Sequence, residues 1–179
     1  MATREIVLPE TNPETEWILD RPVQKVSPTR RHAILQGAMV EWLRTWARGR
    51  GEVGTEWRFR ITPPGEITRP LVPDVAYVSY ERLKPLSIAD RELPPLAPDI
   101  VVEILSPDDR PADVNHKRDV YLAAGAATVL LVDPDQRTLE VFDADGTHHK
   151  YADSDTYTPE RFPGLTLSLT GLFAELDIP

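Results

Sequence analysis

The sequence contains no cysteine, and this absence excludes both disulfide bonds and thiolate metal sites. It also lacks any apolar run long enough to cross a membrane. Residues 1–17 are polar and acidic, without the basic start and apolar centre of a secretory signal. We therefore expect a cytoplasmic protein with no membrane partner.

Positive charge is scarce, because 20 Lys and Arg residues face 29 Asp and Glu residues, for a net charge of −9. This balance argues against strong general affinity for nucleic acid, since phosphate binding needs clustered basic side chains. The charge is uneven, however, and residues 25–69 carry nine basic and four acidic side chains. That segment is either an ordinary solvated surface or a phosphate-facing side on an acidic body.

A length of 179 residues and a hydrophobic content of 41% fit one globular domain with its own core. Residues 1–26 are rich in Pro and Glu and show little periodicity, so they are predicted to form an irregular N-terminal arm. Residues 27–179 then form the domain.

Apolar periodicity predicts that helices and strands alternate along this domain, which indicates an α/β fold. Ser27 and Pro28 are expected to start the first helix, and the glycines at 51 and 54 to close it. Residues 80–98 read as a long proline-rich loop. The expected helices cover residues 27–48, 109–124 and 169–176, and the expected strands cover residues 56–61, 71–79, 99–105, 128–132, 139–142 and 147–151.

Glu103 interrupts the most apolar of the expected strands. Because side chains alternate faces along a strand, Glu103 shares a face with Val101 and Leu105, and both faces around it are apolar. An ionised carboxylate is very costly in such a place unless it is paired or bound to a cation. A buried salt bridge and a metal ligand both satisfy this requirement.

Asp74 occupies the corresponding place on another expected strand, between Pro73 and the run from Val75 to Val78. One interpretation is a strand-entry residue that accepts hydrogen bonds from nearby backbone amides. The other places Asp74 opposite Glu103, where the two carboxylates supply oxygen ligands for a hard cation such as Mg²⁺ or Mn²⁺. The backbone carbonyl of Ile104 could supplement them.

Lys117 lies at helical spacing from Val114 and Tyr121, which mark the inward face of the second expected helix. A lysine on that face needs an anionic partner. Asp113, four residues earlier, could serve, and so could Glu103 or Asp74 on the sheet. A metal, two carboxylates and an inward lysine together suit phosphodiester hydrolysis, with the lysine orienting the nucleophile or neutralising developing negative charge.

Four segments around these residues resemble the Uma2 family, also called the DUF820 group of restriction-endonuclease-like proteins. The segments are Pro73-Asp74-Val75, Val102 to Pro107, Lys117 to Tyr121 and Leu131 to Pro134. The resemblance spans roughly residues 25–175 and implies the PD-(D/E)xK nuclease fold, a mixed central sheet flanked by helices, with Mg²⁺ as cofactor. It also implies that Asp74 and Glu103 are the metal-binding acidic residues.

The sequence departs from the general nuclease motif at position 105, where Leu stands in place of the expected lysine. Lys117 takes that place in the predicted catalytic set of Asp74, Glu103 and Lys117. The resulting hypothesis is a Mg²⁺-dependent endonuclease acting on DNA.

Two alternatives remain beside this hypothesis: a non-catalytic nuclease-fold module that binds nucleic acid or protein, and an enclosed salt-bridge network without a ligand. A homodimer is also predicted, because a second copy could cover the apolar terminal helix and the edge of the last hairpin.

Overall fold

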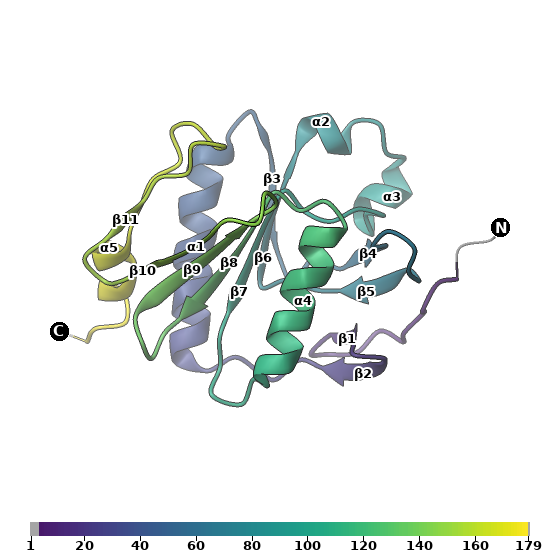
Figure 1. Cartoon of the computed structure of the whole chain (residues 1–179), viewed down its shortest axis with the longest axis horizontal. Helices are drawn as coiled ribbons and strands as arrows, with labels where there is room; N and C mark the ends of the chain where they lie inside the picture. Colours follow the sequence, from purple (N-terminus) through teal and green to yellow (C-terminus); the bar gives the residue numbers. More distant parts are fainter. Residues whose placement is uncertain (1–3, 179) are drawn as a thin grey trace.

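The structure, a computed structural model, describes residues 4–178 and is built around a mixed sheet of six strands (Figure 1). The strand order is β10-β9-β8-β7-β6-β3; the neighbours β7 and β8 run parallel, and the other neighbouring pairs run antiparallel. These strands are β3 (Gly51–Thr55), β6 (Val75–Ser79), β7 (Ile100–Ile104), β8 (Thr128–Asp133), β9 (Thr138–Asp143) and β10 (His148–Tyr151).

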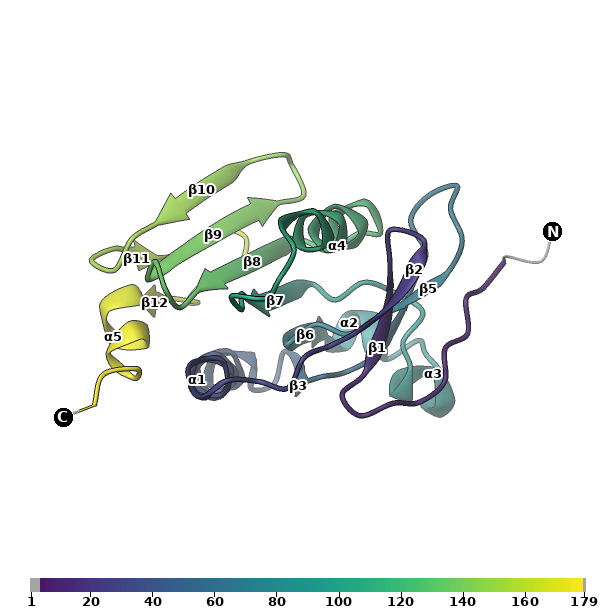
Figure 2. The same ribbon diagram turned by 90° about the horizontal axis from the view of Figure 1, so that it is seen from below.

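Helices cover both faces of this sheet, as Figure 2 shows. Helix α1 (Arg30–Ala47) and the short α5 (Leu169–Ala174) pack against one face, and α4 (Pro111–Ala123) packs against the other. Helix α4 also makes the crossover between the parallel strands β7 and β8. The predicted fold class, a mixed sheet flanked by helices, is therefore confirmed.

The start of α1 differs from the prediction by a few residues. Thr29, not Ser27, caps the helix, and its hydroxyl accepts a hydrogen bond from the backbone N–H of His32 at 3.4 Å. Pro28 holds the preceding residue in an extended conformation, which keeps Ser27 outside the helix. The two glycines expected after the helix belong to β3, where a side chain on Gly51 would lie 2.2 Å from the carbonyl oxygen of Val78.

The strand predicted over 56–61 begins three residues later, and the strand predicted over 71–79 is interrupted. Residues 56–58 separate β3 from β4 (Phe59–Ile61), and residues 72–74 separate β5 (Arg69–Leu71) from β6. Proline at position 73 has no N–H for a sheet ladder, which explains the second break. Strands β4 and β5 pair with each other as a separate two-stranded sheet.

The prediction of an irregular arm was wrong for residues 15–24, which form a β-hairpin of β1 (Thr15–Ile18) and β2 (Arg21–Gln24). Strand β1 contacts β5 and α4, and Ile18 is buried in the core beneath α4. Figure 2 shows the hairpin crossing beside the end of α4. Residues 1–3 of the predicted arm lie outside the described residues.

Smaller elements complete the fold. Two short helices, α2 (Tyr80–Leu83) and α3 (Ile88–Glu92), occupy the segment predicted as a long loop. Strands β11 (Thr156–Tyr157) and β12 (Leu167–Ser168) pair near the C-terminal end. Among residues 4–178 no helix combines the length and apolarity needed to span a bilayer.

Candidate active site

Asp74 lies immediately before β6 and points to the α4 side of the sheet, the side that Ala76 and Val78 of the same strand also face. Only 3% of the residue is exposed. One carboxylate oxygen, Oδ2, accepts a hydrogen bond from the backbone N–H of Ile104 at 2.7 Å. The alternative interpretation of Asp74, an acceptor of backbone amides, therefore describes one of its contacts, although that amide belongs to β7.

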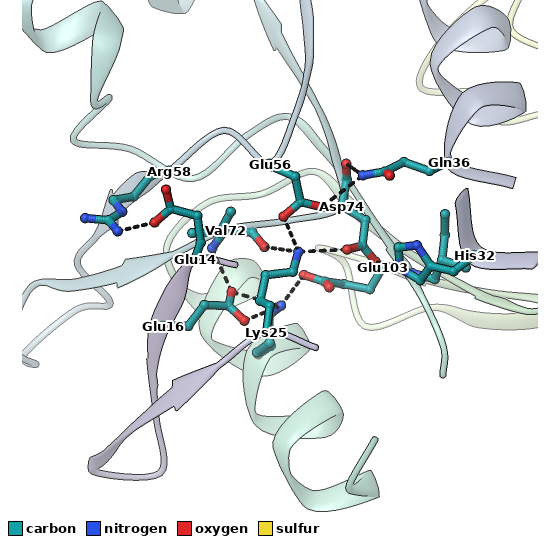
Figure 3. Close-up of polar contacts among 12 residues, drawn as sticks. Glu14, Glu16, Lys25, His32, Gln36, Glu56, Arg58, Val72, Asp74 and Glu103 are labelled. Atoms are coloured by element: carbon teal, nitrogen blue, oxygen red, sulfur yellow. Dashed lines mark hydrogen bonds and ion pairs between the residues drawn. The ribbon is translucent and has the colours of Figure 1, made fainter. Parts of the chain in front are cut away.

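Two cationic or donor side chains also reach Asp74 (Figure 3). The ammonium of Lys25 lies 2.7 Å from Oδ1, and Nε2 of His32 lies 3.2 Å from Oδ2. Burial alone would raise the pKa of Asp74, but the charge of Lys25 and the hydrogen bond of His32 hold that pKa well below its usual range. Asp74 is therefore an anion at every physiological pH.

Glu103 faces α4 from β7, on the same face as Val101, as strand alternation predicts. Its Oε1 lies 2.7 Å from the ammonium of Lys117. Burial, together with the neighbouring carboxylates of Asp74 and Glu16, outweighs the attraction of Lys117 and raises the pKa of Glu103 to about 8. Glu103 therefore ionises less readily than an ordinary glutamate.

Lys117 points inward from α4, as its spacing predicts, and is 7% exposed. Its ammonium contacts both oxygens of Glu16, at 2.9 and 3.1 Å, besides Glu103. Desolvation lowers the pKa of Lys117, but Glu103 and Glu16 raise it by more, so the side chain stays charged. The alternative partner Asp113 is instead bound by Arg21 of the hairpin, at 2.6 Å.

The hairpin supplies two residues that the sequence reasoning missed. Glu16 of β1 is 3% exposed and accepts a hydrogen bond from the backbone N–H of Val72 at 2.7 Å, besides the ammonium of Lys117. Lys25 follows β2, and its ammonium lies within 3.0 Å of the Val72 carbonyl oxygen, Asp74 and Glu56. Desolvation opposes the charge of Lys25, yet four nearby carboxylates raise its pKa.

Helix α1 contributes a third wall. Besides His32, it carries Gln36, whose side-chain amide donates to Glu56 Oε1 and to the backbone oxygen of Asp74, both at 2.9 Å. Within the described part of the chain, His32 Nδ1 is buried and has no hydrogen-bond partner. Helix α1, strands β6 and β7, helix α4 and the hairpin therefore all hold Asp74 or Glu103 in place.

All three predicted site residues, Asp74, Glu103 and Lys117, line one pocket with a volume of about 860 Å³. Glu16, Lys25, His32 and Glu56 line it as well, and we call it the Asp74 pocket. The three-way convergence that the sequence suggested is therefore present in the structure. Its chemical role remains a prediction.

The charges in the pocket do not balance. The carboxylates of Glu16, Asp74 and Glu103 are all buried, and two lysines oppose them: Lys117, which is buried, and Lys25, whose side chain is 14% exposed. Three ionised carboxylates would exceed these two lysines by one negative charge, and this excess adds to the burial that raises the pKa of Glu103. A cation from solution could offset the same charge.

These residues could supply only part of the ligands of a divalent ion. Across residues 4–178, no group of three or more His, Asp or Glu side chains is arranged to hold a metal ion. Mg²⁺, however, commonly uses one or two carboxylates and takes its other ligands from water and substrate phosphate. Glu103 Oε1 is enclosed and receives no well-oriented hydrogen bond from the described residues, so a further cationic partner suits it.

Several basic side chains of the segment 25–69 are paired with acidic side chains. Arg31 pairs with Asp135, Arg58 pairs with Glu14, and Arg60 pairs with Asp90. The phosphate-facing role of this segment stays a prediction, and of its nine Lys and Arg residues, all of them described, Lys25 alone lines the Asp74 pocket.

One weak signal in the sequence could have revealed the hairpin. In β1, Glu16 stands between Thr15 and the apolar pair Trp17-Ile18, which is a buried carboxylate pattern like that of Glu103. The turn hid this pattern, because Leu19 and Asp20 adopt positive φ without a glycine to indicate it.

Comparison with known proteins gives two matches. A family model described as "Uma2: Putative restriction endonuclease" matches residues 6–177. The chain also resembles a solved structure described as "a putative nuclease belonging to DUF820" from Anabaena variabilis, with 27% identity, 94% coverage of each chain and a TM-score of 0.81. No curated protein matches the chain. The matched residues include the β1–β2 hairpin, so Glu16 and Lys25 lie within the region of family similarity.

Proposed function

Because this chain belongs to the Uma2 family, we propose that it is an endonuclease that hydrolyses phosphodiester bonds of DNA with Mg²⁺ or Mn²⁺ as cofactor. The observation that carries the proposal is the shared pocket, in which the buried carboxylates of Asp74 and Glu103 stand beside the buried ammonium of Lys117. Family membership supports a nuclease, and the residues of the pocket support the metal-dependent reaction.

Asp74 and Glu103 are the proposed metal ligands, and the bound ion would activate water and stabilise charge on the phosphate. Asp74 suits this role because it is anionic at every physiological pH. The hydrogen bond from Ile104 N–H and the contact with His32 orient its carboxylate before any ion arrives. Lys117 holds Glu103 inside the pocket and keeps a positive charge beside it.

The test is nicking of supercoiled plasmid with Mg²⁺ or Mn²⁺, by the wild-type protein and by Asp74→Ala and Glu103→Ala variants. We expect wild-type nicking that EDTA stops and that both variants lack. Glu140→Gln, on β9 and outside the Asp74 pocket, is the matched control and should retain activity. Calorimetric titration with Mn²⁺ adds a readout that does not depend on turnover, and both site variants should bind the ion more weakly.

A non-catalytic binding module is the second candidate, and one observation favours it. Both oxygens of Asp74 already have partners within the chain, namely Lys25 on one side and Ile104 N–H with His32 on the other. If these contacts are all that Asp74 makes, then ligand binding needs no metal ion and does not depend on Asp74. DNA binding by wild type and Asp74→Ala with equal affinity, together with no nicking under either metal, would establish this alternative.

A further inference from the structure

The Asp74 pocket contains two lysines, and their ammonium groups are held in different ways. Lys117 is buried and has Glu16 Oε1 and Oε2 and Glu103 Oε1 within 3.1 Å, of which Glu16 Oε2 accepts a hydrogen bond. The side chains of Glu16 and Glu103 are 4% and 11% exposed, so neither can turn into solvent to make room for another anion. Moving either one away would leave the Lys117 ammonium buried without a partner.

Lys25 also has three oxygens nearby, but one of them is replaceable. The Val72 carbonyl and Asp74 are enclosed, whereas the Glu56 side chain is 41% exposed. Glu56 can therefore turn into solvent, where hydration replaces its contacts with Lys25 and Gln36. A phosphate oxygen entering the pocket can take its place, because it offers the same charge and the same acceptor geometry.

The backbone around Lys25 is anchored well enough to present its ammonium at a fixed point. The Lys25 N–H donates to the backbone oxygen of Glu14 at 2.8 Å, and the Glu14 carboxylate pairs with Arg58. Figure 3 shows Lys25 reaching from the hairpin toward Asp74 and Glu56. A lysine held in this way can orient a bound phosphate next to Asp74.

We propose that Lys25 is the side chain that contacts a phosphate of bound DNA, exchanging Glu56 for it, while Lys117 is a positioning residue that acts through Glu103. The assignment rests on the proposed function in taking DNA as the ligand. It gives the N-terminal hairpin a direct part in substrate binding, and it separates the roles of two lysines that occupy one pocket.

The experiment measures binding of a short fluorescein-labelled DNA duplex by anisotropy over a series of KCl concentrations, with saturating Ca²⁺ in place of Mg²⁺. For Lys25→Met we expect weaker binding and a fall of about 0.9 in the slope of log affinity against log salt, the value for one lost phosphate contact. Lys25→Arg should keep the wild-type slope. Lys84→Met, a remote exposed lysine outside the pocket, is the charge-matched control and should also keep it.

Lys117→Met separates the two roles. It should leave the salt slope unchanged while it weakens Mn²⁺ binding in calorimetry, because it acts on Glu103. Glu56→Gln gives a test in the opposite direction, since freeing Lys25 should tighten DNA binding by more than the exposed control Glu41→Gln does. Glu56→Gln also guards against a Lys25→Met protein that fails to fold.

Three outcomes overturn the assignment: an unchanged slope for Lys25→Met, an equal fall of slope for Lys117→Met, or no DNA binding by the wild type. Equal effects of Glu56→Gln and Glu41→Gln overturn the exchange. The proposed reaction fails separately. If the wild-type protein never nicks plasmid but its salt slope falls with Lys25→Met, the Lys25 contact stands and the nuclease proposal fails. If the wild type nicks plasmid and the slope is unchanged, the nuclease proposal stands and the Lys25 contact fails.

Discussion

The two faces of the central sheet are built on opposite principles. On the α1 face, the packed cluster is apolar, and Leu35, Met39 and Leu43 of α1 pack against valine and isoleucine from β6, β7 and β8. The buried His32 near the start of α1 is a polar exception, and it contacts Asp74. On the α4 face, the apolar cluster stops at the end of β7, where Glu103, Asp74 and two lysines replace it. Burial of apolar side chains on the α1 face stabilises the fold, whereas removing charged groups from water on the α4 face costs free energy.

This difference teaches where stability and chemistry can be changed separately. Apolar burial contributes roughly 25 cal/mol for each Å² removed from water and depends little on pH. Buried ion pairs contribute little net stability, yet breaking one leaves an uncompensated charge at high cost. Substitutions on the α1 face should therefore alter stability alone, whereas substitutions in the Asp74 pocket should alter stability, pH dependence and metal binding together.

The largest expected effect is that of Lys117→Met on stability. The variant leaves the Glu16 carboxylate buried without its cation and removes the charge that pairs with Glu103, so we expect a loss of about 3–5 kcal/mol in the free energy of unfolding at neutral pH. Urea denaturation followed by circular dichroism measures it. The loss should shrink as pH falls and the carboxylates take up protons. A variant as stable as the wild type at neutral pH would contradict the buried triad.

Leu43→Ala tests the other face. Leu43 lies on the inward face of α1 and is fully buried, so the change should cost about 2–5 kcal/mol through lost burial and a residual cavity. Unlike the loss from Lys117→Met, this loss should stay constant between pH 5 and 9, because Leu43 has no titratable group. The folded variant should still bind Mn²⁺ with wild-type affinity. A change in metal affinity would mean that the two faces are coupled.

The sequence also predicted some parts of the site and of the fold better than others. Asp74, Glu103 and Lys117 were found because each interrupts an apolar pattern whose period shows which way the side chain points. The pairing of Lys25 with Asp74 spans 49 positions, and no local pattern carries such information. Periodicity predicted three helices and five of the six strands of the sheet, and it missed β3. The hairpin is too short for periodicity to establish it, with four residues in each strand.

The exact ends of the elements were predicted less well for a local physical reason. Thr29 and Ser27 are both good helix caps, and only the position of Pro28 between them decides which one serves. In the same way, β3 accepts Gly51 because β6 approaches it too closely for a side chain. Each of these outcomes depends on contacts made after folding.

Glu103→Gln should stabilise the metal-free protein at high pH. The pKa of Glu103 is raised to about 8, so between its ordinary value near 4.5 and pH 8 the folded state holds a proton that the unfolded state has released. Its contribution therefore falls as pH rises through that window. The amide has no proton to lose, and we expect a gain on the order of 1–3 kcal/mol over wild type at pH 9.

Thermal melts of both proteins from pH 5 to pH 9, in EDTA and then with Mg²⁺, measure this difference. The curves should lie closest together near pH 5 and separate as pH rises through about 8. Mg²⁺ should raise the melting temperature of the wild type and leave Glu103→Gln unchanged, because an ion bound at Glu103 stabilises only the protein that binds it. Parallel curves at every pH would show that Glu103 ionises as an ordinary carboxyl.

The smallest effect is expected for the surface pair of Arg31 and Asp135, whose side chains are 45% and 61% exposed. Asp135→Asn should change the free energy of unfolding by less than about 1 kcal/mol, because water screens an exposed pair and both groups hydrate well when separated. The effect should vanish in high salt, which the buried pair of Lys117 and Glu103 resists. Denaturation of Asp135→Asn and Lys117→Met at low and high KCl compares the two directly. If high salt removed the stability loss of Lys117→Met as fully as that of Asp135→Asn, the Asp74 pocket would be open to solvent. Its carboxylates would then be hydrated and would not need a bound cation.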